Sequence, residues 1–341
     1  MRARERTATA LRGGDTDRPA LAHLFMGGAH HVMRRSDRRL GEAYRTPGGI
    51  SEIQGVAAEL FGHDAGTVPW GCLTVEAEAF GCELEWFDDY YPRIASHPLE
   101  SDADLARLGV PDPGISARMP LVLESLSLVR ERLGEDQFVV ALVVSPFLVA
   151  AELRGMVGLL SDLVLAPGFA DELMERVTQG IEGYVRAIAA QGAADAIMFE
   201  NASVGREMLG PLHVERFVMP FERHLLAAAR AERPDLLLIE HNCAEGPYVG
   251  EVLELDVDVV HVANADQSAV RDAGFARLGT VDNQRLLLDG TPTEVDRAAR
   301  KELTAASGGG FVLSTSCEIP FAAPLENIQA LSAACRTLSS G

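Results

Sequence analysis

The chain has 341 residues, 47% of them hydrophobic and 23% charged, which is enough to bury a sizeable core. Thirty basic and fifty acidic residues give a formal charge of −20, and this excess repels nucleic-acid phosphates and anionic membrane surfaces. We therefore expect no nucleic acid and no membrane among the partners of the protein.

The sequence favours a cytoplasmic location. The basic N-terminal segment is not followed by the continuous apolar stretch of a signal peptide. The most apolar window, residues 138–153, is interrupted by Ser145 and Pro146 and is shorter than the about 20 residues that span a bilayer. Five cysteines, spread from Cys72 to Cys335, do not make a disulfide framework, so we expect reduced thiols that are free to bind metal.

Short apolar runs with the composition of β-strands recur along the chain and become regular from about residue 137. They alternate with longer segments of helical periodicity, which is typical of βα units in a parallel sheet. In chain order the runs are "PALAHLFMGG", "TVPWGCL", "FVVALVVS", "AIMFEN", "LLLIEHN", "VDVVHVAN", "RLGTVDN" and "GFVLSTS". Their number approaches the eight strands of a (β/α)8 barrel.

Three segments between or after these runs have clear helical signals. Residues 167–192 carry apolar side chains at three-to-four spacing and end at a glycine, while residues 291–310 open with Thr-Pro and an acidic first turn. Residues 324–338 close the chain in the same way. The alternative fold is an open doubly wound sheet, but no Gly-x-Gly-x-x-Gly pattern follows an early strand. We therefore predict a (β/α)8 TIM barrel.

Two parts of the chain fall outside the regular pattern. An N-terminal extension precedes the first strand, and residues 76–118 are rich in Pro, Asp and aromatic side chains. We interpret the second part as an inserted cap segment, of the kind that often helps to close the site of a barrel. Because no repeat and no low-complexity linker divides the sequence, we expect residues 1–341 to form a single domain.

Polar residues follow the apolar runs at the positions where the strands are expected to end. The carboxyl ends of barrel strands meet at one face, and that face carries the active site. Residues that are remote in sequence are therefore expected to become neighbours there. They are Ser145, Glu200, Asn201, His241, Asn242, Cys243, His261, Asn264, Asp266, Asp282, Asn283, Ser316, Cys317 and Glu318.

A metal site is the interpretation we favour for three of these residues. His241 and Cys243 are two residues apart, so on an extended strand their side chains project to the same side. Cys317 follows another strand-like run and is expected at the same face. One nitrogen and two sulfur ligands leave a fourth position open, as in catalytic zinc sites. The alternative is a hydrogen-bonded histidine beside small buried thiols, which is how we interpret Cys72, Cys82 and Cys335.

Two further residues would cost free energy if they were buried without a hydrogen bond or a functional role. Glu200 ends an apolar strand, where a carboxylate must be hydrogen-bonded or functional. His261 interrupts "VDVVHVAN" and is a core histidine, a fourth metal ligand or a substrate contact.

Several longer motifs extend this pattern: "EAFGCELEWFDDYYPRIASHPL", "SPFLVAAELRG", "LGPLHVERFVMPF", "EHNCAEG", "LGTVDNQRLLLDGTPTEV" and, most specifically, "GGGFVLSTSCEIPFAAPLENIQAL". With these motifs the chain resembles the uroporphyrinogen decarboxylase superfamily and, within it, the zinc-dependent branch typified by methylcobamide:coenzyme M methyltransferases. The resemblance runs in order from about residue 5 to residue 338. It implies a (β/α)8 barrel, in agreement with the periodicity.

The resemblance also implies a ligand set, because the methyltransferase branch has His-x-Cys after one strand and a Cys before the "EIP…PLEN" segment. These positions correspond to His241, Cys243 and Cys317 as zinc ligands. The decarboxylase branch works without metal, and its N-terminal arginine-containing signature is not visible here. The sequence departs from the family pattern at Ser145, Ala244, His261, Thr280 and Asn283, which bears on the substrate rather than on the metal.

The chemistry that the resemblance implies is the transfer of a methyl group from a methylcorrinoid, carried by a separate protein, to a thiol activated on zinc. A small thiol and a corrinoid protein are the expected partners, and a homodimer is compatible with the sequence. The predicted roles are catalytic for Glu200 and His261 and substrate-binding for Asn201, Asn264 and Asp282. The alternatives are a zinc-dependent thiol alkyltransferase acting on an epoxide, a metal-free decarboxylase and a non-catalytic partner of a corrinoid protein.

Overall fold

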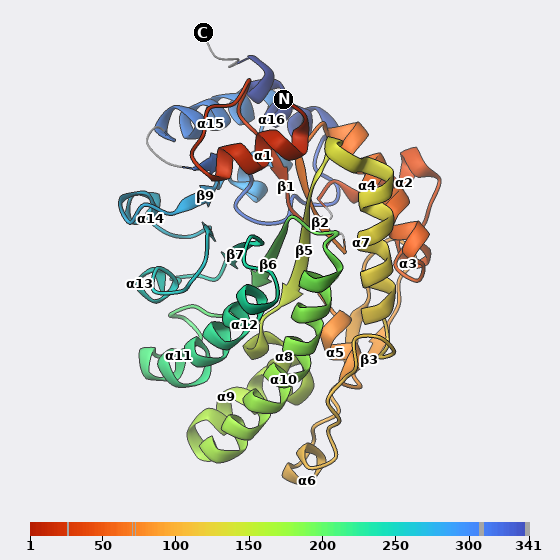
Figure 1. The fold of residues 1–341 in the computed structure, drawn as a ribbon, viewed down its shortest axis with the longest axis vertical. Helices are drawn as coiled ribbons and strands as arrows, with labels where there is room; N and C mark the ends of the chain where they lie inside the picture. Colours follow the sequence, from red (N-terminus) through yellow and green to blue (C-terminus); the bar gives the residue numbers. More distant parts are fainter. Residues whose placement is uncertain (26, 70, 72, 307–309, 338–341) are drawn as a thin grey trace.

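The computed structural model describes residues 1–25, 27–69, 71, 73–306 and 310–337. Within these ranges the chain forms one sheet of eight parallel strands and a separate two-stranded hairpin (Figure 1). The order of the strands in the large sheet follows their order in the chain. These strands are β1 (Ala22–His23), β2 (Ala65–Val68), β5 (Phe138–Val144), β6 (Ala196–Glu200), β7 (Leu237–Asn242), β8 (Val259–Val262), β9 (Ala276–Leu278) and β10 (Phe311–Val312).

Backbone contacts between the first and last strands close the sheet into a barrel. Leu21 and Leu313 form a parallel bridge next to β1 and β10. The amide of Ala22 donates to the carbonyl of Leu313 at 2.8 Å, and the amide of Leu313 donates to the carbonyl of Ala20 at 2.9 Å. Closure removes the free edges that an open sheet would leave. The prediction of a (β/α)8 barrel is therefore confirmed.

Helices connect successive strands and cover the outside of the barrel (Figure 1). The segments with clear helical signals form α10, α15 and α16, so those expectations are confirmed. The helices are α1 (Ala3–Leu11), α2 (Ala29–Ser36), α3 (Leu40–Ala43), α4 (Pro47–Phe61), α5 (Val75–Ala79), α6 (Asp102–Leu105), α7 (Met119–Leu133), α8 (Pro146–Arg154), α9 (Met156–Leu165), α10 (Pro167–Gln191), α11 (Pro211–Phe217), α12 (Met219–Glu232), α13 (Val249–Val252), α14 (Gln267–Asp272), α15 (Pro292–Ala305) and α16 (Leu325–Thr337), with a 3-10 turn η1 (Gly134–Asp136) and a π-helical turn η2 (Asn283–Leu288). None of the described helices combines the length and the apolar character needed to traverse a bilayer.

Alternation along the strands separates the barrel interior from the layer under the helices. On β5, Val140 and Leu142 belong to the inner apolar cluster, whereas Val139, Ala141 and Val143 belong to the outer cluster packed against helices. On β7 the inner cluster includes Ile239, two residues before His241. The side chain of His241 therefore enters the barrel, and that of Glu240 points toward the helices.

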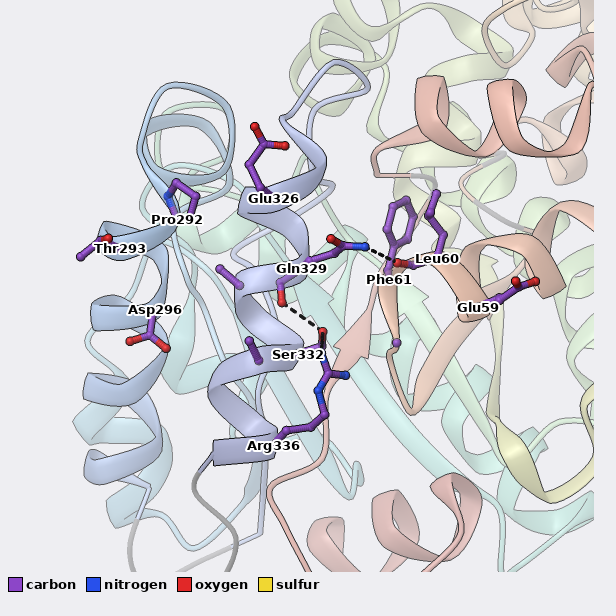
Figure 2. A pocket seen from close by; sticks show the side chains of 13 residues that line it. Glu59, Leu60, Phe61, Pro292, Thr293, Asp296, Glu326, Gln329, Ser332 and Arg336 are labelled. Atoms are coloured by element: carbon purple, nitrogen blue, oxygen red, sulfur yellow. Dashed lines mark hydrogen bonds between the residues drawn. The ribbon is translucent and has the colours of Figure 1, made fainter.

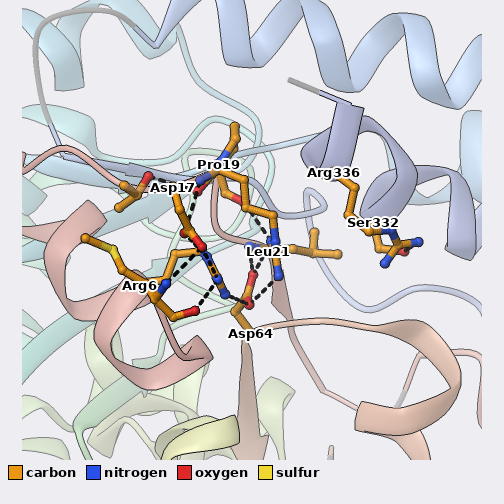
Figure 3. A network of polar contacts seen from close by, with 10 residues as sticks. Arg6, Asp17, Pro19, Leu21, Asp64, Ser332 and Arg336 are labelled. Carbon is orange, nitrogen blue, oxygen red and sulfur yellow. Dashed lines mark hydrogen bonds and ion pairs between the residues drawn. The ribbon is translucent and has the colours of Figure 1, made fainter. Parts of the chain in front are cut away.

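The N-terminal extension is α1, which packs against β2, β5 and β10 and is fixed to the barrel by ion pairs (Figure 3). The guanidinium of Arg6 bonds Asp17 at 2.7 Å and Asp64 at 2.8 Å, and Arg18 bonds Asp64 at 2.8 Å. Asp64 also accepts the amide of Leu21 at 3.0 Å. Because Arg6 and Asp64 are buried, removal of either residue would leave the other with a single remaining ion-pair partner, Asp17 for Arg6 or Arg18 for Asp64.

The inserted segment lies between β2 and α7. It contains α5, the antiparallel hairpin β3 (Glu83–Glu85) and β4 (Arg93–Ser96), and α6. Tyr90, at the tip of the hairpin, packs on Phe321 with ring centroids 4.4 Å apart. Phe321 follows Cys317 in the loop after β10, so the insertion covers part of the loop that carries a predicted metal ligand.

The predicted strand boundaries are less accurate than the predicted strand order. β1 covers only two residues of "PALAHLFMGG", and β2 begins before "TVPWGCL" and ends at Val68, ahead of Pro69. Proline has no amide hydrogen to donate to a neighbouring strand, which is why pairing ends there. The remaining residues of "TVPWGCL" include Trp70 and Cys72, which lie outside the described residues.

Candidate metal centre and acceptor pocket

Strand register brings the predicted site residues together. Glu200 on β6 pairs with His241 on β7, and His241 pairs with His261 on β8. Cys243 follows β7, and Cys317 follows β10 across the barrel mouth. One ligand atom from each of His241, Cys243 and Cys317 lies within 4.8 Å of the others, and no other such group of His, Cys, Asp and Glu occurs among the described residues.

The ligand atoms fit zinc in type and in spacing. The sulfurs of Cys243 and Cys317 lie 3.4 Å apart, and the Cys317 sulfur lies 4.0 Å from Nε2 of His241. Bonds of about 2.0–2.3 Å to a tetrahedral zinc ion place its N and S ligands roughly 3.5–3.8 Å apart. One imidazole and two thiolates are a soft ligand set that suits zinc better than magnesium or calcium.

A second buried histidine, His261, fixes the orientation of the His241 ring. Nδ1 of His241 lies 2.7 Å from Nδ1 of His261, and Nε2 of His261 lies 3.0 Å from the carbonyl oxygen of Thr315. A carbonyl only accepts, so Nε2 of His261 donates. Burial, with His241 close by, holds the pKa of His261 well below its usual range, so its Nδ1 is an acceptor. Nδ1 of His241 therefore carries a hydrogen, and Nε2 is the atom that is free for a metal.

The two cysteine sulfurs are joined by a hydrogen bond. This bond lowers the pKa of Cys317 to about 4, and His241 contributes in the same direction. The same hydrogen bond, together with burial, raises the pKa of Cys243. The pair therefore holds a thiolate at neutral pH, the form of cysteine that binds metals.

Glu200 lies beside the ligands on the inner wall of the barrel. Its Oε2 is 3.3 Å from Nε2 of His241 and makes no hydrogen bond among the described residues, although the side chain is buried. Burial raises the pKa of Glu200 to about 7, opposed by His241 and reinforced by Cys317. A buried carboxylate oxygen without a hydrogen bond next to three ligands is suited to a fourth coordination position.

Side-chain hydrogen bonds hold the two loops that carry the cysteines. Asn242 accepts the amide of Ala244 at 2.9 Å and donates to the carbonyl of Val204 at 2.9 Å. Asn264 donates to the carbonyl of Cys243 at 3.0 Å. In the other loop the hydroxyl of Thr315 donates to the carbonyl of Cys317 at 2.7 Å. The positions of both sulfurs are thus set by neighbouring polar groups.

A pocket of about 420 Å³ opens above the two cysteines. Asn264 and Asp282, both predicted to bind substrate, line it together with Cys243 and Cys317. The other described lining residues are Glu245, Ala263, Thr280, Asn283, Gln284 and Ser316. Glu245, two residues beyond Cys243 in "EHNCAEG", was not predicted as a site residue, because a glutamate in a surface loop has no distinguishing local signal.

Asn201 does not line this pocket. Its amide donates to Glu240 at 2.7 Å on the outer side of the barrel wall. Glu222 of α12 lies near the same two residues, and burial raises its pKa to about 7, against the effects of Asn201 and Ser145. The structure therefore places Asn201 in a buried polar cluster behind the site, defined here as Ser145, Asn201, Glu222 and Glu240.

A larger hollow, of about 730 Å³, lies elsewhere on the molecule (Figure 2). It is lined by the end of α4 and by α15 and α16, where Gln329 donates to the carbonyl of Leu60 at 3.0 Å. None of the predicted site residues is among its described lining residues. Size alone therefore does not mark the functional site, and the smaller pocket contains the reactive groups.

Comparison with known families agrees with this geometry. The model of the family described as uroporphyrinogen decarboxylase (URO-D) matches residues 2–338. The chain belongs to this family. The resemblance stated from the motifs is thereby confirmed.

The relatives divide between two activities. The chain is 24% identical to a methylcobamide:CoM methyltransferase, MtbA, of Methanosarcina mazei, over 96% of this chain and 95% of the relative. It is 26% identical to a uroporphyrinogen decarboxylase of Anaeromyxobacter dehalogenans, over 96% of each. Among solved structures, a methyltransferase from Methanosarcina mazei superposes with a TM-score of 0.88 at 23% identity and covers 99% of both chains, which establishes the fold. The predicted methyltransferase class is confirmed by the named methyltransferase relatives.

The cysteines outside the site are placed as follows. Cys82 is buried and its thiol donates to the carbonyl of Glu152 at 3.5 Å, and Cys335 is buried within α16. Neither belongs to the ligand group. Cys72, also interpreted as structural, lies outside the described residues.

Proposed function

We propose that this protein transfers a methyl group from a methylcorrinoid, carried by a separate protein, to a thiol bound at a zinc site made by His241, Cys243 and Cys317. The observation that carries the proposal is the convergence of these three ligand atoms under an open pocket at the mouth of the barrel. Methylcobamide appears in the names of the methyltransferase relatives, which supports a corrinoid as the donor. A cytoplasmic location, where thiols stay reduced, is part of the proposal.

A zinc ion bound at this site would supply the positive charge that keeps an acceptor thiol deprotonated and nucleophilic. The residues of the chain hold the ligands in place and admit the acceptor. His261 and Thr315 fix the ring of His241, and Glu200, whose Oε2 lies beside Nε2 of His241, would hold the fourth position of a bound zinc ion until an acceptor enters. The pocket admits the acceptor from the side of the two cysteines.

The reaction balances without a further reactant. The thiolate sulfur forms a bond to the methyl carbon, and the cobalt–carbon bond breaks with its electron pair left on cobalt. The proton of the thiol passes to solvent. The product is a methyl thioether, and the corrinoid is left in its reduced, unmethylated form.

A specific observation argues against the decarboxylase alternative. Uroporphyrinogen carries a carboxylate on each of its many side arms, so a site for it needs basic residues. Among the described residues that line the pocket, the charged side chains other than the cysteines are Glu245 and Asp282, and both are acidic. The pocket would repel such a substrate.

The proposal is tested with the full chain purified without chelator. We expect about one zinc per chain by mass spectrometry, consistent with a single site. With methylcobalamin and a small thiol, we expect formation of cob(I)alamin and of the S-methyl product. Cys317→Ala should lose both zinc and transfer, whereas the matched control Cys82→Ser should keep both. Full zinc and full transfer in Cys317→Ala would refute the proposal, and consumption of an epoxide or of uroporphyrinogen instead would identify the alternative.

A further inference from the structure

We propose that the pocket above Cys243 and Cys317 selects an acceptor thiol with a positively charged tail, bound between Glu245 and Asp282. This inference rests on the proposed function and names its substrate class. It concerns the tail of the acceptor, which lies away from the sulfur atom. The three metal ligands do not determine which tail can bind.

The composition of the pocket wall gives the first argument. Seven of the ten described lining residues offer polar side chains that are not metal ligands, and the two charged ones among them are both carboxylates. No lysine, arginine or histidine is found among the described residues of this wall. The charge of the whole chain, −20, has the same sign.

The contacts of the two carboxylates give the second argument. Glu245 is exposed, and its Oε1 accepts a hydrogen bond from the neutral amide of Asn264 at 3.2 Å. This contact orients the carboxylate without neutralising it. The backbone of Arg206 lies next to this loop, because its amide donates to the carbonyl of Gly246. Its guanidinium, however, lies over the ring of Tyr248 at 4.4 Å and makes no ion pair with Glu245 among the described residues.

Asp282 is only partly compensated. Its Oδ1 accepts the amide of Arg285 at 2.8 Å, and its Oδ2 lies 3.6 Å from Nε of Arg285. The side chain of Arg285 is 81% exposed, so solvent screens most of this ion pair. An ammonium group that enters the pocket would therefore meet Glu245, which makes no ion pair among the described residues, and Asp282, which is weakly paired with Arg285.

The expected acceptor thus differs from the one in the relatives' names. Coenzyme M is 2-mercaptoethanesulfonate, an anion at neutral pH. An anionic tail would have to lie next to like charges and would find amide and hydroxyl groups but no cation in the described wall. With a tail that carries an ammonium group, the interaction with the carboxylates of Glu245 and Asp282 becomes attractive.

Three thiols with the same two-carbon chain test the inference: cysteamine, 2-mercaptoethanol and 2-mercaptoethanesulfonate. Their binding to the zinc-loaded full chain is measured by calorimetry, and their methylation by methylcobalamin is measured separately. We expect cysteamine to bind about tenfold more tightly than the sulfonate, which corresponds to a modest charge interaction at a partly exposed site.

An amine also lowers the pKa of the thiol itself, so a higher affinity of the wild type for cysteamine could have this cause. The decisive quantity is therefore the change that mutation makes in the ratio of the cysteamine affinity to the sulfonate affinity. In the double variant Glu245→Gln, Asp282→Asn the preference for cysteamine should fall at least about fivefold, a large part of the expected tenfold ratio. Asparagine still caps η2, so folding should be kept. Asp266→Asn is the matched control: Asp266 also caps a helix, α14, but does not line the pocket.

Binding and transfer distinguish the two proposals. If the sulfonate binds as tightly as cysteamine to the wild type, or if the double variant keeps the wild-type ratio, the charged-tail proposal is refuted even when methyl transfer occurs. If none of the thiols is methylated but the ratio behaves as expected, the transferase proposal fails, whereas the charge preference of the pocket stands.

Discussion

Nδ1 of His241 lies 2.7 Å from Nδ1 of His261, on adjacent strands and at paired positions of the register. The pairing determines which nitrogen of His241 faces the cysteines. His261 thus acts on a metal through His241, and the carbonyl of Thr315 in turn fixes His261. This chain of contacts connects β7, β8 and the loop after β10.

Replacement of His261 by phenylalanine keeps a ring in the core but removes the acceptor for the hydrogen on Nδ1 of His241. We expect zinc affinity to fall by about 10–100-fold, the usual effect of losing such a partner, while the three ligands remain. Competition with a chromogenic chelator measures the affinity. His213→Phe, a change outside the ligand group, is the control and should leave the affinity unchanged. An unaltered affinity in His261→Phe would show that the contact is not needed for metal binding.

Gly205 permits the close approach of the loop that carries Cys243 and Glu245. It forms an antiparallel bridge with Pro247, and a Cβ at Gly205 would overlap the carbonyl oxygen of Glu245. We expect Gly205→Ala to destabilise the fold by about 1–3 kcal/mol and to weaken zinc binding, because the loop must shift. Thermal unfolding and chelator competition measure the two effects.

The control for this loop is Gly250→Ala in α13. A Cβ there meets open space, and alanine favours a helix over glycine. The stability of Gly250→Ala should equal that of the wild type or be slightly higher. If Gly205→Ala and Gly250→Ala show the same thermal stability and the same zinc affinity, the close contact at Gly205 does not constrain the loop.

The sequence predicted the barrel and the proximity of the three expected ligands because both depend largely on local patterns. Short, continuous apolar runs at β5 and at the start of β7 indicate buried strands, and the two-residue spacing of His241 and Cys243 indicates a common side. The boundaries of β1 and β2 were less predictable because these strands are short and contain residues such as Ala65 and Gly66 that are depleted in strands.

Contacts between residues on different strands and loops could not be predicted from apolar runs and residue spacing. The partnership of His261 with His241 depends on the register between β7 and β8, and that of Asn201 with Glu240 on the register between β6 and β7. Because these parallel strands are buried on both faces, their continuous apolar runs do not single out one register. The same holds for Glu245, which becomes a pocket residue only because the loop after β7 folds toward the loop after β9.

The contact between the inserted hairpin and the loop after Cys317 rests on aromatic rings. Phe321 packs on Tyr90 at 4.4 Å and meets the edges of Tyr91 at 5.9 Å and His30 at 6.0 Å. Each such pair contributes about 0.5–1.5 kcal/mol beyond the burial of area. We expect Phe321→Ala to loosen the hairpin and to speed proteolytic cleavage between residues 83 and 96. Leu212→Ala, an exposed position on α11, is the control, and equal cleavage rates in the two variants would contradict the expected role of Phe321.

The buried polar cluster of Ser145, Asn201, Glu222 and Glu240 predicts a pH dependence of stability. Burial raises the pKa of Glu222 to about 7, above its ordinary value near 4.5, so the folded state binds a proton more tightly than the unfolded state. The stabilisation is fully present below about pH 4.5 and is lost as the pH rises through about 7. One such carboxyl changes the free energy of unfolding by at most about 1.4 kcal/mol per pH unit.

Glu222→Gln replaces the carboxyl by a neutral group of the same shape. We expect the variant to lose less stability than the wild type between pH 5 and pH 7, within the interval from about 4.5 to about 7 over which this carboxyl releases its proton. Chemical unfolding at several pH values gives the two slopes, and their difference measures the contribution of Glu222 together with its effect on the pKa of Glu240. Glu254→Gln, which changes an exposed carboxylate paired with Arg223, should keep the slope of the wild type. Equal slopes in Glu222→Gln and the wild type would mean that Glu222 carries no extra proton in the folded state.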